Sequence, residues 1–286
     1  MPSLIDIRRR IRSVKNTQQI TKAMKMVATA RLRKAQERVV NARPYSRMLH
    51  EMVANVASAA GPEASSLHPL LAVREEKRVQ LVLVTADRGL AGSFNTNLIK
   101  AAQQFLAGNE GREVTMELYG RKGRDFFRRR DVKISGEVTG ISQAASYDNA
   151  EALADMLIDR FTSGEIDSAY IIYNEFKSVL TQQVEVKRIL PLSLPGEPGS
   201  GRDYILEQPP VEFLTNLLPG YVEAQVFEAF LESAAAEHAA RMTAMDSATT
   251  NATEVVAKLT LYMNRVRQAS ITREIIEVVS GASALE

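Results

Sequence analysis

The stretch Met245–Ala269, MDSATTNATEVVAKLTLYMNRVRQA, decides the fold because its apolar and small residues recur at alternating spacings of three and four. A repeat of this kind over more than three heptads predicts a long helix that pairs with another helix in a left-handed coiled coil. The helical run begins near Tyr221 and meets no Gly or Pro before Gly281. The predicted seam consists of Met245, Ala248, Ala252, Val255, Leu259, Tyr262, Val266 and Ala269.

Residues 3–59 form the only other segment long enough to be the partner of this helix. Ser3 can cap it, with Asp6 three residues later in the capping-box position. Pro44 predicts a kink or break, and Gly61-Pro62 predicts the end of the helix. Because a whole domain lies between the two helices in the chain, we expect them to run antiparallel.

The apolar stripe of this N-terminal helix is interrupted. It begins with a 3-4-3 spacing, and a polar gap follows at residues 16–19. The first part consists of Leu4, Ile7, Ile11 and Val14, and the stripe is expected to resume at Ile20, Met24 and Val27 and later at Met48, Met52, Val56 and Ala59.

The middle of the chain alternates predicted strands with predicted helices. Val79–Thr85, VQLVLVT, is a nearly continuous apolar run, as expected for a strand buried on both faces. Alternation of this kind indicates a small α/β sheet with crossover connections. Further strands are expected at 114–119, 132–137, 169–174 and 184–190, and helices at 95–106, 121–130 and 148–162.

The predicted fold is therefore α/β plus all-α: a long antiparallel coiled coil of the two chain ends with a central Rossmann-like α/β domain. The expected divisions are an N-terminal coiled-coil helix at 1–60, the α/β domain at 76–195, a Gly/Pro-rich loop at 196–210 and a C-terminal coiled-coil helix at 211–286.

Charge is distributed unevenly along the chain. Residues 1–43 carry twelve Lys/Arg and two acids, whereas the whole chain has a net charge of only +2. A basic arm of this kind favours an acidic partner. The chain has no Cys and three His far apart in sequence, so thiol chemistry is excluded and a His-rich metal site is not expected.

Two other classes of function remain as alternatives. The turn DRGLAGSFN at 87–95 follows a buried strand and favours a nucleotide-binding α/β enzyme with coiled-coil arms, although neither GxGxxG nor GxxxxGK[ST] is present. The run Arg8-Arg9-Arg10-Ile11-Arg12 favours a nucleic-acid binder. However, the first 44 positions contain no aromatic residue that could stack on a base, and no nucleic-acid fold motif is present. We therefore expect no nucleic-acid partner.

The C-terminal stretch Ile271–Ala284, ITREIIEVVSGASA, carries a more specific pattern. It resembles the C-terminal signature of the γ subunit of F-type ATP synthase, which here consists of Thr272, Glu274, Glu277, Gly281 and Ala282. The resemblance also covers the segment Thr21–Val27. It implies the central rotor shaft of a proton-translocating synthase, with no catalytic residue, metal or cofactor in this chain and with ATP, ADP and Mg held by partner subunits.

The resemblance implies two contact surfaces. Contacts with the stator, the α3β3 head, fall on Lys22, Met24, Lys25, Arg241, Arg267 and Gln268, and contacts with the membrane ring fall on Tyr204, Leu206 and Glu207. The implied partners are the α, β and ε subunits and the c-ring. An acid-poor N-terminus also resembles a mitochondrial presequence, but the helical pattern continues well past any cleavage point. We therefore expect a peripheral protein on the cytoplasmic side of a bacterial inner membrane.

Overall fold

The computed structural model describes residues 3–60, 68–140, 145–193 and 208–283. The chain divides into two compact units. The first, Met1–Ala28 with Met242–Glu286, is called the rod unit, and the second, Thr29–Arg241, is called the sheet unit. Two helices, α1 (Leu4–Ala60) and α6 (Pro210–Ser283), begin in one unit and end in the other.

The start of α1 is fixed by the predicted capping box. The hydroxyl oxygen of Ser3 accepts from the Asp6 backbone N–H at 3.2 Å, and the Asp6 carboxylate accepts from the Ser3 backbone N–H at 3.3 Å. Each interaction satisfies a backbone donor that the first turn of a helix leaves open. The prediction of one helix over 3–59 is confirmed by the bounds of α1.

Within the rod unit α1 and α6 run antiparallel, as predicted. Three side-chain pairs show the direction, because residue numbers rise along α1 as they fall along α6. Gln18 Nε2 donates to Thr253 Oγ1 at 2.6 Å, the hydroxyl oxygens of Thr21 and Thr249 lie 2.8 Å apart, and Lys25 Nζ lies 2.6 Å from Asp246 Oδ1. We call these six residues the polar layers.

The polar layers correct the predicted stripe on α1. The least exposed side chains of α1 in the rod unit keep the 3-4 spacing straight through the expected gap, so Gln18 and Thr21 belong to the seam. Ile20, Val27 and, further along, Met48 are exposed, and the prediction that they face a partner helix is wrong. The stripe observed in the rod unit consists of Leu4, Ile7, Ile11, Val14, Gln18, Thr21, Lys25 and Ala28.

The predicted seam on α6 is correct at Met245, Ala248, Ala252, Leu259 and Val266, which are buried or half-buried, and wrong at three positions. Val255, Tyr262 and Ala269 are exposed, and the inward-facing positions are one residue further along the helix. Thr249 lies at the seam beside Ala248, and its hydroxyl bonds across to Thr21. The observed seam includes Met245, Ala248, Thr249, Ala252, Val256, Leu259, Met263, Val266 and Ser270.

Neither proline interrupts its helix. Pro44 lies inside α1 and Pro219 inside α6. Of the predicted kink or break at Pro44, the break is therefore wrong, because α1 is continuous there. Helix α6 begins at Pro210, eleven residues before Tyr221. Pro44 is exposed, which places its ring on the solvent side of the helix. A proline removes one backbone hydrogen bond, and a long helix that is packed along its other face can keep its path despite that loss.

The sheet unit contains a five-stranded sheet in the order β3-β2-β1-β4-β5. The first four strands pair in parallel and β5 pairs antiparallel to β4. All five predicted strands and all three predicted helices of the middle region are present. The elements are η1 (Pro69–Leu71), β1 (Arg78–Val84), α3 (Phe94–Gly108), β2 (Glu113–Tyr119), α4 (Arg121–Phe127), β3 (Lys133–Val138), α5 (Tyr147–Thr162), β4 (Ser168–Phe176) and β5 (Gln182–Leu190).

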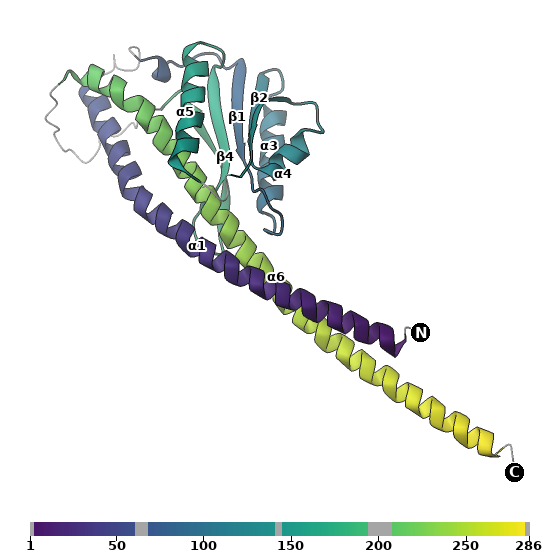
Figure 1. Cartoon of the computed structure of the whole chain (residues 1–286). Coiled ribbons are helices and arrows are strands. Elements are labelled where there is room, and N and C mark those ends of the chain that lie inside the picture. Colours follow the sequence, from purple (N-terminus) through teal and green to yellow (C-terminus); the bar gives the residue numbers. More distant parts are fainter. Residues whose placement is uncertain (1–2, 61–67, 141–144, 194–207, 284–286) are drawn as a thin grey trace. The chain divides into compact units, whose positions relative to one another are not determined.

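Helices cover both faces of this sheet, with α3 and α4 on one face and α5 on the other (Figure 1). The sheet-unit part of α6 packs on the α5 face. Tyr119 at the end of β2 contacts Phe230 of α6, with ring centroids 5.1 Å apart, and Tyr147 of α5 contacts Phe227 at 5.6 Å. Strand β1 is buried after its first residue, as its apolar sequence predicts. The long helix α6 is therefore a structural layer of the sheet unit as well as half of the rod.

Candidate functional site

Ligands of open α/β sheets bind outside the carboxyl ends of the parallel strands. From β1 the chain adds β2 and β3 on one side of the sheet and then β4 on the other side of β1, so the strand order reverses between β1 and β4. Open α/β sheets bind ligands in the crevice outside the carboxyl ends of the strands at such a point. The turn after β1 has the backbone of a tight binding loop, with positive φ at Leu90 (62°) and Gly92 (55°). Asp87 in this turn accepts from the backbone N–H groups of Arg121 and Gly140.

Helix α6 bridges the two strand ends at this place. Glu232 accepts from the Phe176 backbone N–H at the end of β4, at 3.0 Å, and pairs with Arg43 of α1 at 3.2 Å. Burial raises the pKa of the Glu232 carboxyl, and the Phe176 N–H and the Arg43 guanidinium oppose that rise. One carboxylate thus joins α1, α6 and β4.

Arg241 makes the second connection, to the turn after β1. Its guanidinium donates to the carbonyl oxygens of Arg88 at 3.3 Å and Gly89 at 3.4 Å. It also pairs with Glu237 at 2.7 Å, and the two side chains are only 11% and 5% exposed. Through this one guanidinium, α6 therefore contacts carbonyl oxygens of the turn after β1.

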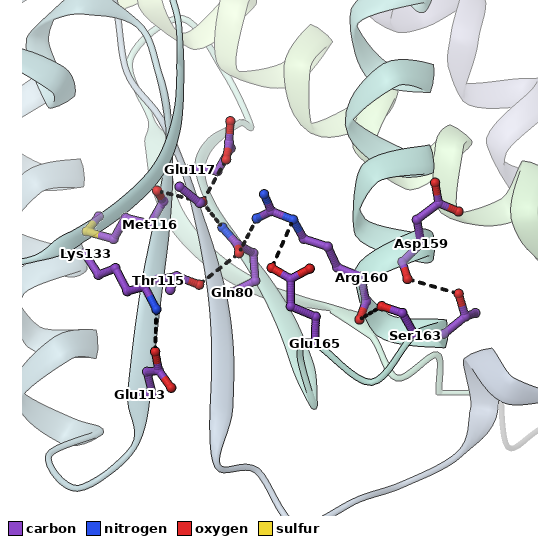
Figure 2. Close-up of polar contacts among 12 residues, drawn as sticks. Gln80, Glu113, Thr115, Met116, Glu117, Lys133, Asp159, Arg160, Ser163 and Glu165 are labelled. Carbon is purple, nitrogen blue, oxygen red and sulfur yellow. Dashed lines mark hydrogen bonds and ion pairs between the residues drawn. The ribbon is translucent and has the colours of Figure 1, made fainter.

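A buried polar cluster lies within the sheet (Figure 2). Gln80 of β1 donates from Nε2 to Ser135 Oγ at 2.9 Å, and its Oε1 accepts from Thr115 Oγ1 at 2.9 Å and Arg160 Nη1 at 3.1 Å. Glu117 Oε2 accepts from Ser135 at 2.9 Å. These contacts link β1, β2, β3 and α5. The role of the cluster is to satisfy polar groups inside the sheet.

The predicted stator contacts lie in different surroundings. Lys22 is exposed and Met24 is half-buried, whereas Lys25 is paired with Asp246 in the polar layers. Arg267 and Gln268 are exposed on α6. Arg241, in the sheet unit, is committed to Glu237 and the turn after β1. The structure brings Lys22, Met24 and Lys25 together on one turn of α1.

The signature residues lie on the part of α6 that extends beyond the first residue of α1. In the polar layers, Gln18 faces Thr253 and Lys25 faces Asp246, and the same register brings Leu4 level with about Arg267. Beyond that point α6 continues alone (Figure 1). Thr272, Glu274 and Glu277 are exposed on this part, and Gly281 and Ala282 lie in its last turn. The predicted ring contacts Tyr204, Leu206 and Glu207 lie outside the described residues.

Two features were missed from the sequence. Five apolar side chains are exposed on the unpaired end of α6, namely Ile271, Ile275, Ile276, Val278 and Val279. Four of the five fall off the predicted heptad positions, Ile276 being the exception, and this excess of apolar residues is the signal that could have identified them. The buried Glu237–Arg241 pair has the i,i+4 spacing of an ordinary surface pair, so only its Ala-rich surroundings indicate burial.

Metal-binding and membrane-spanning features were also sought. Across residues 3–60, 68–140, 145–193 and 208–283, no group of three or more His, Cys, Asp or Glu side chains is placed to hold a metal ion. In the same ranges, none of the helices combines the length and apolar character needed to cross a bilayer.

The fold defines a class of protein in which an α/β domain is inserted between the two helices of an antiparallel rod. A family model described as ATP synthase matches residues 3–285. An ATP synthase gamma chain from Solibacter usitatus is 60% identical over 287 residues, covering 100% of both chains, and one from Pelotomaculum thermopropionicum is 49% identical over 288 residues with the same coverage. The chain belongs to the ATP synthase gamma chain family, which confirms the resemblance found in its sequence.

Solved structures share this fold at low sequence identity. A chain of the Euglena gracilis mitochondrial ATP synthase, from an OSCP/F1/c-ring structure, superposes with a TM-score of 0.69 at 19% identity, over 99% of this chain and 94% of that one. A chain of the Tetrahymena thermophila mitochondrial ATP synthase central stalk/c-ring superposes with a TM-score of 0.62 at 23% identity, over 80% and 99%.

Proposed function

We propose that this chain is the central-stalk shaft of a proton-translocating ATP synthase, and that it couples rotation of a membrane ring to ATP synthesis in an α3β3 head. Its membership of the gamma chain family carries the proposal. The central-stalk and c-ring complexes that contain chains of the same fold support it. The proposed partners are the α, β and ε subunits and the c-ring, without nucleic acid.

The rod unit has the features that this role requires. Its α6 end carries exposed apolar residues on one stretch and exposed charged or polar residues, including Arg267 and Gln268, on another. A rod made of two helices with different side chains is asymmetric in cross-section, so it would present a different surface to each of three β subunits. Each rotation step then changes the contact free energy of each β subunit and shifts its population between open and closed conformations.

The chain itself is proposed to be non-catalytic and to bind no cofactor. The carboxyl edge of the sheet supports this view, because α6 engages both the end of β4, through Glu232, and the turn after β1, through Arg241. ATP, ADP and Mg would then be bound by partner subunits. The enzyme alternative would require α6 to leave this edge.

The proposed contacts with the head rank by the freedom of their side chains. Lys22, Arg267 and Gln268 are exposed and can meet a partner without a rearrangement. Lys25 would exchange or share Asp246, and Arg241 would have to leave Glu237. Met24 is half-buried and offers the partner one side of its thioether chain.

The contact with the ring is proposed for Tyr204, Leu206 and Glu207. Ring attachment would make the chain a peripheral component of a membrane complex, and we propose the cytoplasmic side of a bacterial inner membrane. Gamma chains similar to it in sequence come from Solibacter usitatus and Pelotomaculum thermopropionicum.

Affinity purification from native membranes tests this function. A tagged chain should bring down α and β subunits at three copies each per chain, together with the ε subunit and the ring. Isolation of the chain alone, with ATP hydrolysis or NAD binding that is lost on replacing Gly89 or Gly92, would instead establish the nucleotide-enzyme alternative.

A further inference from the structure

A small hollow opens between three helices of the sheet unit. Its volume is about 280 Å³, and it is lined by Arg31, Lys34 and Arg38 of α1, by Leu231 and His238 of α6, and by Ala145 before the start of α5. At about 30 Å³ for each water molecule, it has room for about nine waters, or for a small ion with part of its hydration shell.

One wall of the hollow is cationic. Arg31, Lys34 and Arg38 are three and four residues apart, so they lie on one side of α1. None of the three forms an ion pair within the described part of the chain, whereas the neighbouring Arg33 pairs with Glu37. Like charges this close repel one another, and an anion in the hollow would relieve that repulsion.

The opposite wall holds a buried imidazole. His238 is 7% exposed, and its Nδ1 has no hydrogen-bond partner among the described residues. A buried polar atom left without a partner is destabilising, so a ligand that supplies a partner gains free energy on binding. Burial first, and then the charges of Arg241 and Arg31, lower the pKa of His238 to about 4, so the ring is neutral near pH 7 and can still donate one N–H.

The beginning of α5 lies beside the same hollow. Ala145 lines it, Ser146 is the N-cap residue of this 16-residue helix, and the Ser146 side chain makes no capping hydrogen bond. The N-terminus of a helix carries a partial positive charge and open backbone N–H groups. Asp148 and Glu151 follow in α5, but neither lines the hollow.

We propose that this hollow is a binding site for a small phosphate-type oxyanion, held by Arg31, Lys34 and Arg38 and contacted by the imidazole of His238. Arginine provides the planar pairs of N–H donors that match phosphate oxygens, and Lys34 adds a third positive charge. The buried ring of His238 provides a polar group on the side away from solvent. None of the residues proposed to contact the head lines this hollow.

Histidine NMR on the full-length chain tests the site directly, because the chain has only three His. Inorganic phosphate is added to about 50 mM at constant ionic strength, enough to fill a site with a Kd near 1 mM. The ring signal of His238 should shift and saturate, while those of His50 and His68 stay in place. No shift at His238, or an equal shift of all three signals, would overturn the proposal.

Matched variants separate the site from general attraction to a basic helix. Arg31→Gln and Arg38→Gln should each weaken phosphate binding at least about tenfold, whereas Arg33→Gln should leave it unchanged because Arg33 does not line the hollow. Equal weakening by all three variants would contradict the proposal. So would saturation by acetate at the same concentration, since it would show a site for any anion, including a carboxylate of a partner protein.

Discussion

Replacing Arg241 by Ala tests how much the contacts of this side chain stabilise the packing of α6 on the sheet. The change removes the guanidinium from the buried carboxylate of Glu237 and from the carbonyl oxygens of Arg88 and Gly89. Loss of one partner from a buried ion pair costs about 3–5 kcal/mol because a charge stays buried without its counterion. Since Arg241 keeps some exposure, we expect the lower end of this range, about 3 kcal/mol.

Native-state hydrogen exchange measures this loss where it occurs. The free energy of opening for amides in β1 and β4 should fall by about 3 kcal/mol, and amides of the Arg88–Gly92 turn should exchange faster still. The double variant Arg241→Ala/Glu237→Ala should cost less than the sum of the two single variants by about 1–3 kcal/mol, because it leaves no isolated charge.

An exposed pair of the same spacing provides the control. Arg33 and Glu37 are also four residues apart, but their side chains are 85% and 63% exposed. Arg33→Ala should therefore change stability by less than about 0.5 kcal/mol. If Arg241→Ala costs under about 1 kcal/mol, or if the costs of Arg241→Ala and Glu237→Ala simply add, the pair does not fasten α6 to the sheet.

Three other changes test separate parts of the structure. Val256→Asp should destabilise the rod by at least about 1 kcal/mol in thermal melts followed by circular dichroism. Val255→Asp, on the exposed side, should change stability by less than about 0.5 kcal/mol. A larger loss for Val255→Asp would mean that the seam predicted from the sequence is correct. Burial raises the pKa of Glu232 in the folded protein above its usual 4.5. Wild type should therefore gain stability relative to Glu232→Gln as the pH falls from 7 toward 4.5. Urea titrations that show the opposite trend would contradict the burial of this carboxyl. Gly120→Ala should lower the free energy of unfolding in urea by about 2 kcal/mol or more. Gly120 has a φ of +95°, and a Cβ there would lie 2.0 Å from the Thr85 carbonyl oxygen. An unchanged urea midpoint would refute this strain.

The long helices were predictable because they depend on a repeat that extends over many turns. The position of the seam within each turn was harder to predict. A search for apolar residues selected Ile20 and Val255, whereas the structure places Thr21 inside and leaves Val255 exposed. Threonine can occupy a seam when its hydroxyl has a partner on the other helix, as Thr21 has in Thr249. That pairing depends on the register of two distant segments, which one sequence does not reveal.

The sheet was predictable for a different reason. Strand β1 is buried on both faces and shows this as a continuous apolar run, and helices α3, α4 and α5 separate the strands from β1 to β4. The role of α6 at the carboxyl edge was not predictable. Glu232 and Arg241 lie in a helix that the heptad pattern assigns to the rod, and only folding brings them to the ends of β4 and β1.

Direct observation of rotation tests the central claim. The chain has no Cys, so Leu180→Cys, at a position 83% exposed between β4 and β5, gives one attachment point for a bead. With an α3β3 head fixed to a surface, ATP should drive the bead in one direction, with one dwell for each β subunit in every turn. A bead that stays still while the assembled head hydrolyses ATP at its full rate would contradict the account of this chain as the rotating shaft.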